Sequence, residues 1–494
     1  MRSRLRSVRT PLVLLAAALL AACGSASDSA VSVVAIGRPT EPFVRGARLP
    51  FAAQLVQGST AEGLVSFDEQ GRVIPALADR WIVTDDGRSY IFRLRDGTWR
   101  DGTPLSAKTA RAALDQSIRA LSGTPLGLDL AGIDEVREMA ARVVEVRLVR
   151  PMPHFLQLLA QPELGLRHAG RGAGPMVLAR ERDNALLTPL PPETVGLPRI
   201  ESWNERVRPV RFVALPGEAA VQRFNRGDAD LLLGGRIEHF PLASSVGLLR
   251  GTIQLDPVSG LFGLAVLKAD GFLAEPANRE ALAMAIDREA LIAQFGVGNW
   301  TPSTRIVAAG LDQETGTVGE RWADLSLDAR RQAAAARVAA WRKGPGRGAA
   351  VKLAIALPAG PGSDRLFAHL QRDFATIGVE VARGREDRGA VLVLLDDVAR
   401  YPRAGWYLNR FNCATWRGLC DKGADILAAQ ARASADPAEA ASLLADAEAE
   451  LTQANVFIPF GPPVRWSLVR GDVTGFATNR WGWHPLMPMA MLPR

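Results

Sequence analysis

Acidic, basic and aromatic side chains gather in residues 391–420, which read VLVLLDDVARYPRAGWYLNRFNCATWRGLC. Trp406, Tyr407 and Trp416 lie in this segment together with Arg410. Aromatic and arginine side chains are favoured at binding surfaces, where they offer packing area and a charged hydrogen-bond donor. They predict noncovalent capture of a small molecule on the floor of a cleft. Tryptophans near a strand end are at least as often part of the core, so a packing role stays open for each.

The same segment holds Cys413 and Cys420, which are separated by six residues. In an oxidising compartment such a pair favours a disulfide that closes a small loop. Two buried, reduced cysteines are the alternative. No histidine lies nearby, so the pair does not predict a metal site.

The third cysteine, Cys23, follows an apolar stretch that begins at Leu12, and four arginines precede that stretch. This layout is typical of a secretory signal peptide, and the stretch is too short to span a bilayer. Residues 20–23 read LAAC, which resembles a bacterial lipobox, whose cysteine is acylated and becomes the new N-terminus. We therefore expect lipidation of Cys23 and membrane attachment through the lipid anchor alone. An ordinary signal peptide with an incidental cysteine is the alternative.

The sequence lacks the common motifs of covalent and metal-dependent catalysis. No G-x-S-x-G, H-E-x-x-H or G-x-x-x-x-G-K-[ST] pattern occurs in it. We therefore expect no enzymatic activity, no metal and no cofactor. A pair of carboxylates brought together by folding stays open, because counting residues cannot exclude it. The five histidines are scattered: His154, His168, His239, His369 and His484.

Charge and length narrow the class of protein further. Without the four arginines of the expected signal peptide, the chain has 55 Lys and Arg residues and 52 Asp and Glu residues, so its net charge is small. The sequence shows no basic stripe, so we expect no nucleic-acid partner. A hydrophobic content of 48% is ample for packed cores, and a chain of 494 residues normally divides into two or more domains.

The elements that must position these side chains alternate between strands and helices. Residues 88–95 alternate apolar and polar side chains and predict a strand, after which Ser106 is a suitable helix N-cap. Residues 351–357 predict a strand, and a helix from Ser363 to Gly378 follows it. This order indicates an α/β protein with a mostly parallel sheet and helices on its faces.

Six longer stretches together resemble one family, the bacterial extracellular solute-binding proteins of the oligopeptide, dipeptide and nickel group, also called family 5. These proteins are the capture subunits of ABC importers. The matching stretches occur in family order and spread over most of the chain that follows the leader. They are GLVSFDEQGRVIPALADRW (63–81), DDGRSYIFRLRDGTWRDGTPLSA (85–107), FNRGDADLL (224–232), NREALAMAIDREALI (278–292), LQRDFATIGVEV (370–381) and NVFIPF (455–460).

The resemblance implies an α/β, two-lobed fold of the periplasmic-binding-protein type, of type II, in the large cluster with an extra lobe I subdomain. It also implies a hinge of crossing strands, with ligand enclosed between the lobes. By that template the chain divides as follows: 1–22 signal peptide, 23–30 lipidated tether, 31–255 lobe I, 256–461 lobe II and 462–494 a C-terminal return to lobe I.

The resemblance also points to candidate ligand-binding residues. In peptide-binding relatives, an aspartate shortly after a lobe II strand pairs with the α-ammonium of the peptide. Asp396 and Asp397 follow the corresponding strand here, but aligning the pattern through Pro402 puts Val398 nearest to the acidic position. A helix cap or turn role is equally open for both aspartates. The candidate ligand-binding set is Asp396, Asp397, Trp406, Tyr407, Arg410 and Trp416.

The segment between Val381 and Val391 departs from the family pattern in a way that affects the wall of the ligand site. Relatives place an amphipathic helix between the strand that here contains Val381 and the next strand. Only a polar linker around residues 384–389 separates Val381 from Val391, which leaves no room for a helix. We therefore expect part of the usual lobe II wall to be absent or rebuilt.

The function that these observations predict is that of a lipid-anchored substrate-binding subunit of an ABC importer. It would capture small peptides in the periplasm or at the cell surface and deliver them to permease and ATPase subunits, acting as a monomer. A non-peptide solute, such as a nickel chelate, an oligosaccharide or an opine-like amine, is one alternative. A noncatalytic receptor or structural lipoprotein that kept the fold is the other.

Overall fold

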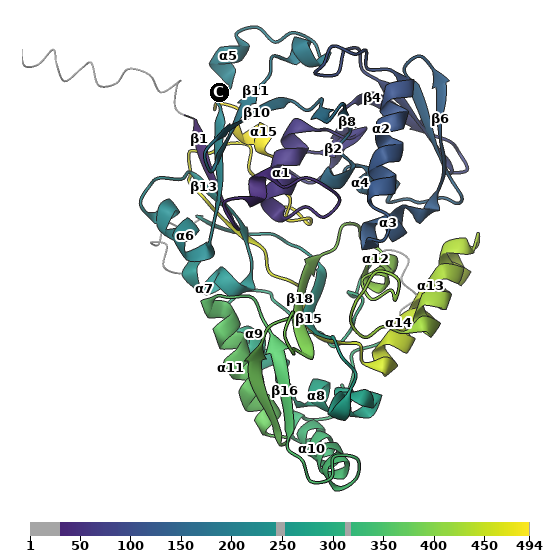
Figure 1. Cartoon of the computed structure of the whole chain (residues 1–494), viewed down its shortest axis with the longest axis vertical. Coiled ribbons are helices and arrows are strands. Elements are labelled where there is room, and N and C mark those ends of the chain that lie inside the picture. Colours follow the sequence, from purple (N-terminus) through teal and green to yellow (C-terminus); the bar gives the residue numbers. More distant parts are fainter. Residues whose placement is uncertain (1–29, 244–251, 312–317, 494) are drawn as a thin grey trace, which may run out of the picture.

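The computed structural model describes residues 30–243, 252–311 and 318–493 of the 494-residue chain (Figure 1). Cys23 and the expected leader lie outside these residues. The described chain is an α/β protein with two large sheets, one of four strands and two small two-stranded sheets.

The largest sheet has seven strands in the order β10-β11-β12-β1-β13-β20-β14. The central strand β1 pairs in parallel with β12 and β13, and the other neighbours are antiparallel. Side chains on alternate positions enter two separate cores, since Val33 packs with α1 and Val34 packs with α6. The elements are β1 (Val31–Ile36), β10 (Met176–Glu181), β11 (Asn184–Pro189), β12 (Val210–Leu215), β13 (Leu231–Gly235), β14 (Ile253–Leu255), β20 (Trp466–Val469), α1 (Phe51–Thr60), α6 (Gly217–Asn225) and α15 (Leu486–Met489).

A second, antiparallel sheet has four strands in the order β4-β5-β7-β6. The predicted strand around residues 88–95 is β5, and its Tyr90, Phe92 and Leu94 are all buried on one face. The predicted N-cap is also present, because the Ser106 hydroxyl accepts from the backbone N–H of Thr109. The elements are β4 (Ala78–Val83), β5 (Ser89–Leu94), β6 (Ile133–Ala140), β7 (Val143–Leu148), α2 (Ala107–Ala120), α3 (Pro125–Asp129), α4 (Phe155–Leu159) and α5 (Trp203–Arg206); the two small sheets pair β2 (Val65–Phe67) with β3 (Val73–Pro75) and β8 (Arg167–His168) with β9 (Arg171–Gly172).

The third sheet has five strands in the order β17-β16-β18-β15-β19. Helices α8 to α11 pack with it, and a helical pair, α13 and α14, lies beside α12 (Figure 1). The elements are β15 (Gly260–Val266), β16 (Val351–Ala356), β17 (Val379–Gly384), β18 (Leu392–Val398), β19 (Phe457–Gly461), α8 (Pro276–Ala285), α9 (Arg288–Ala293), α10 (Leu327–Lys343), α11 (Pro361–Ala375), α12 (Ala404–Asn409), α13 (Lys422–Ala433) and α14 (Pro437–Ala454).

The expectation of mostly parallel sheets is wrong. In the five-stranded sheet β16 is parallel to β17 and β18, but β15 is antiparallel to β18 and β19. The reason is that the chain enters this sheet directly from β14 through residues 256–259 and leaves it directly to β20 through residues 462–465. The entering strand β15 and the leaving strand β19 therefore run in opposite directions and pair antiparallel. The strand β18 runs in the same direction as β19, so its pairing with β15 is antiparallel as well.

These two crossings join the two main parts of the molecule. They run side by side, and the backbone N–H of Asp256 donates to the carbonyl of Arg465 at 3.1 Å. We call the part built on the seven-stranded and four-stranded sheets lobe I, and the part built on the five-stranded sheet lobe II. Figure 1 shows lobe I above lobe II, with α12 at the boundary.

The connection between β17 and β18 is short and contains no helix, as the sequence predicted. It spans residues 385–391 and crosses from one side of β16 to the other. A short crossing is possible because β18 begins where β16 ends, with Leu392 opposite Ile355. Most of β18 therefore extends beyond β16 and lies against β15.

Candidate functional site

A cavity of about 820 Å³ lies where the two lobes meet. This volume is within the usual range for sites that hold a small molecule. Both lobes contribute to its wall: Phe51, Glu163 and Arg236 come from lobe I, and β18 and the segment after it come from lobe II. Trp481 and Trp483 of the C-terminal segment also line it.

The strand β18 delivers the predicted acidic pair to this cavity. Successive side chains on a strand point to opposite faces, so Asp396 and Asp397 have different surroundings. Asp397 lines the cavity together with Trp406, Arg410 and Trp416. Asp396 lies behind the wall and does not line the cavity.

Each aspartate is held by an arginine of the protein itself. Asp396 Oδ1 accepts from Arg465 at 2.7 Å, whereas its Oδ2 is buried without a hydrogen-bond partner in the described chain. Asp397 accepts from Arg410. Burial alone would raise the pKa of Asp397, but the positive charges of Arg410, Arg236 and Arg465 together lower it. Both carboxylates are therefore charge-compensated before any ligand arrives.

Tyr407 is placed differently from its neighbours. Its side chain is 0% exposed in the core, where it makes an edge contact with Trp406 at 4.9 Å between ring centroids. Tyr407 does not line the cavity. The α-helical turn of α12 explains the separation, because consecutive residues project about 100° apart.

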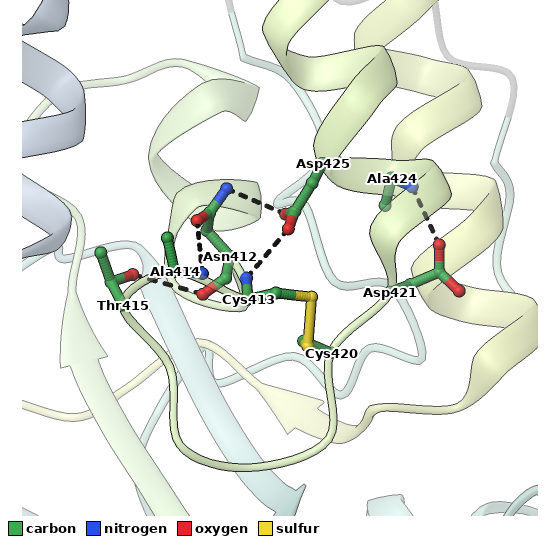
Figure 2. Close-up of a disulfide and its surroundings, with 8 residues drawn as sticks. All are labelled: Asn412, Cys413, Ala414, Thr415, Cys420, Asp421, Ala424 and Asp425. Carbon is green, nitrogen blue, oxygen red and sulfur yellow. Dashed lines mark hydrogen bonds between the residues drawn. A yellow bond between two sulfur atoms is a disulfide. The ribbon is translucent and has the colours of Figure 1, made fainter.

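A disulfide joins Cys413 and Cys420 and closes the loop that carries Trp416 (Figure 2). Asp425 of α13 accepts from the backbone N–H of Cys413 at 3.0 Å and from the Asn412 side chain at 2.9 Å. Hydrogen bonds to Asp425 thus attach the start of the loop to α13, and the disulfide joins the start of the loop to its end. This arrangement presents Trp416 to the cavity from a constrained loop.

An ion pair and a shared carboxylate connect the lobes across the site. Arg400 donates to both carboxylate oxygens of Glu163, at 2.8 and 2.9 Å. Asp129 Oδ1 accepts from the Tyr401 hydroxyl at 2.8 Å and from the Asn409 amide at 2.7 Å. Burial raises the pKa of Asp129 to about 7, against the lowering effect of these donors and of nearby arginines.

Arg236 is a half-buried cation of the described wall that makes no direct ion pair. It follows β13, and its guanidinium donates to the backbone carbonyl of Asp396 at 3.0 Å. No carboxylate of the described residues lies within 4.0 Å of it, although Asp396, Asp397 and Glu238 are near enough to raise its pKa in spite of burial.

Sequence reasoning missed Arg236, Arg400, Glu163 and Asp129. Arg400 and Glu163 are 237 residues apart in the chain, so no local pattern connects them. For Arg236 a weak signal existed, because a charged residue directly after the buried run LLLGG often stands at a functional strand end.

Among the residues with described structure, no group of three or more histidine, cysteine, aspartate and glutamate side chains is arranged to hold a metal ion. His369 is buried, and its Nε2 lies 3.0 Å from Asp373 and from the carbonyl of Asp287, which is a structural role. Within the same described residues, no helix combines the length and the apolar character needed to cross a membrane.

Comparison with known proteins gives one family. The family described as bacterial extracellular solute-binding proteins, family 5, middle, matches residues 72–383. The probable deoxycholate-binding periplasmic protein YgiS of Escherichia coli K12 is 35% identical over 131 residues, 23% of this chain and 24% of the relative. The periplasmic murein peptide-binding protein MppA of the same strain is 27% identical over 266 residues, 46% of this chain and 47% of the relative.

The chain therefore spans about a quarter to a half of the length of these curated relatives. Among solved structures, that of Haemophilus influenzae OppA in complex with the peptide RPPGFSPFR superposes with a TM-score of 0.79 at 16% identity. The superposition covers 94% of this chain and all of the other, and at this identity it concerns the fold alone.

Proposed function

The chain belongs to the family 5 bacterial extracellular solute-binding proteins and has the two-lobed α/β fold of type II periplasmic binding proteins, and from this premise we propose that it is the substrate-binding subunit of an ABC importer. It would enclose a small solute between its lobes and deliver it to a membrane permease that an ATPase drives. No covalent step is needed for this role.

The cavity between the lobes is the single observation that supports this proposal most strongly. Residues of both lobes line it, so a bound solute would contact both and favour their closed arrangement. The two adjacent crossings at residues 256–259 and 462–465 are suited to act as the hinge. A receptor or structural lipoprotein that had lost transport would more readily fill this volume with its own side chains.

Small peptides are the solute class that we propose. Trp406 and Trp416 line the cavity and offer packing that tolerates different side chains. Asp397 is the better candidate for the α-ammonium contact, because it lines the cavity and Asp396 does not. The ammonium would replace Arg410 as the partner of Asp397. The similar MppA is named for binding murein peptide, which supports this choice.

Lipidation at Cys23, a location in the periplasm or at the cell surface, and the lobe boundaries at 255 and 461 belong to the same proposal. Two similar proteins are described as periplasmic. Anchoring through an acylated Cys23 would keep the protein near its permease. Cys23→Ser should release the protein from the membrane fraction, and retention of this variant in that fraction would contradict the lipid anchor.

Thermal unfolding tests the proposed function. Protein expressed from the full chain and stripped of co-purified ligand would be melted with pools of di- to hexapeptides, with oligosaccharides and with nickel–histidine. A ligand at 100 times its dissociation constant adds about 2.7 kcal/mol to the free energy of unfolding. A rise in Tm with peptides that weakens in Asp397→Ala supports peptide capture. A response only to another class keeps the importer function and overturns the peptide assignment, whereas no response to any class contradicts solute binding.

A further inference from the structure

Three guanidinium groups share two aspartates at the meeting point of the lobes. Arg465 is hydrogen-bonded to Asp396, and Arg410 to Asp397. Arg236 is the third cation, and it has no carboxylate within 4.0 Å among the described residues. The cluster therefore carries more positive charge than its paired aspartates balance.

The next acidic group does not form an ion pair with Arg236. Glu238 Oε1 lies 3.8 Å from His239 Nδ1, and its Oε2 is buried without a hydrogen-bond partner in the described chain. Arg236 is therefore left without a direct ion-pair partner among the described residues.

The geometry of Arg236 suits a ligand contact. A guanidinium has five N–H groups, and only one hydrogen bond from Arg236 is formed within the described chain, to the carbonyl of Asp396. The guanidinium nitrogens of Arg236 are not among the buried polar atoms that lack a partner in the described residues, so its unused N–H groups stay accessible at the cavity that Arg236 lines.

Backbone contacts hold this arginine in position. The Trp466 indole N–H donates to the carbonyl of Arg236 at 2.9 Å. Gly234, at φ +81°, lies within the register shift between Leu232 and Gly235 in the pairing of β13 with β20, and a side chain there would collide with Phe51. The end of β13 thus holds the backbone of Arg236 in place at the cavity wall.

We infer that the solute carries a carboxylate and that Arg236 binds it through its unused N–H groups, as the specificity-determining residue for acidic ligands. The inference rests on the proposed function. A guanidinium matches a carboxylate with two parallel N–H···O bonds, which a neutral amide or a hydroxyl cannot reproduce. A carboxylate of the solute would balance the positive charge of Arg236 and accept hydrogen bonds from its unused N–H groups.

The test compares matched acids and amides on the protein expressed from the full chain. A pooled di- to hexapeptide library is prepared twice, once with free C-terminal carboxylates and once as C-terminal amides. Deoxycholate and its methyl ester form a second pair without an ammonium group. Binding is measured by the shift in Tm and by titration calorimetry. We expect the acid of at least one pair to bind and its amide or ester to bind at least about tenfold more weakly.

Variants assign the effect to Arg236. Arg236→Gln should weaken binding of the acid about 10- to 100-fold and remove the preference for acid over amide. Arg236→Lys keeps the charge, so it should keep the preference at about tenfold lower affinity, and it serves if the Gln variant does not fold. Arg211→Gln, an exposed arginine on β12 outside the cavity wall, is the matched control and should bind like wild type.

The outcomes separate this inference from the proposed function. Equal binding of acid and amide, or wild-type acid affinity in Arg236→Gln, overturns the inference and leaves solute capture intact. No binding of any peptide, sugar, chelate or bile acid overturns both.

Discussion

Arg400 of lobe II and Glu163 of lobe I form a two-point ion pair across the cavity, and Gln161 and Gln54 add hydrogen bonds to its two ends. The Glu163 side chain is 3% exposed and that of Arg400 is 29% exposed. The pair is thus buried on one side and partly open on the other, and it links the lobes directly.

Removing one partner of this pair should weaken the contact between the lobes. Glu163→Gln leaves Arg400 without its counter-charge, and because Arg400 is partly exposed we expect a cost of about 2–3 kcal/mol, below that of a fully buried pair. Thermal unfolding and the radius of gyration from solution scattering measure the effect. The exposed pair of Arg383 and Asp364 provides the control, since Asp364→Asn should cost less than about 1 kcal/mol. Equal losses in both variants would contradict a special role for the bridge.

Asp129 should make stability depend on pH. Burial raises its pKa from 3.8 to about 7, so between about pH 4 and 7 the folded protein binds more protons than the unfolded chain. Stability therefore falls as pH rises through this window. Asp129→Asn keeps an oxygen for Tyr401 and Asn409 but does not ionise, so its advantage over wild type should grow to on the order of 1–4 kcal/mol by pH 8. If the difference in Tm between the variant and wild type stayed constant from pH 5 to 8, this prediction would be wrong.

The disulfide between Cys413 and Cys420 should stabilise the loop that carries Trp416. Closing a short loop contributes about 2–3 kcal/mol, chiefly by restricting the unfolded chain. The double variant Cys413→Ser/Cys420→Ser, or wild type under reducing conditions, should lose that amount in chemical denaturation. Ligand affinity should fall as well, because Trp416 loses its constrained position. An unchanged denaturation midpoint after reduction would show that the cross-link does not contribute.

Trp416 should report ligand binding by fluorescence. It lines the cavity, whereas Trp341 packs on Phe272 at the far side of lobe II. Trp416→Phe should reduce the fluorescence change on ligand addition and weaken affinity about threefold to tenfold, in line with about 0.5–1.5 kcal/mol for an aromatic contact. Trp341→Phe should change neither quantity. A full ligand-induced signal in Trp416→Phe would place the contact elsewhere in the wall.

The local elements were predictable because their causes are local. Alternating side chains specify β5, and the hydroxyl of Ser106 caps α2. The short linker after Val381 excluded a helix by its length alone. The direction of strand pairing was not local, and it was predicted wrongly, because it depends on where the chain crosses between the sheets.

The sequence by itself determined the family, the alternation of strands and helices, and the segment of lobe II that reaches the cavity. The tertiary structure alone decided which charges in that segment are already neutralised. Asp396 and Asp397 look equivalent as neighbours in a sequence, yet Asp396 lies behind the wall and pairs with Arg465, whereas Asp397 lines the cavity and pairs with Arg410. Arg236 became a candidate for ligand binding only when these pairings were known. Electrostatic interactions act through space over a few ångströms, and Arg236 and Asp396, which meet at this distance, are 160 positions apart in the chain.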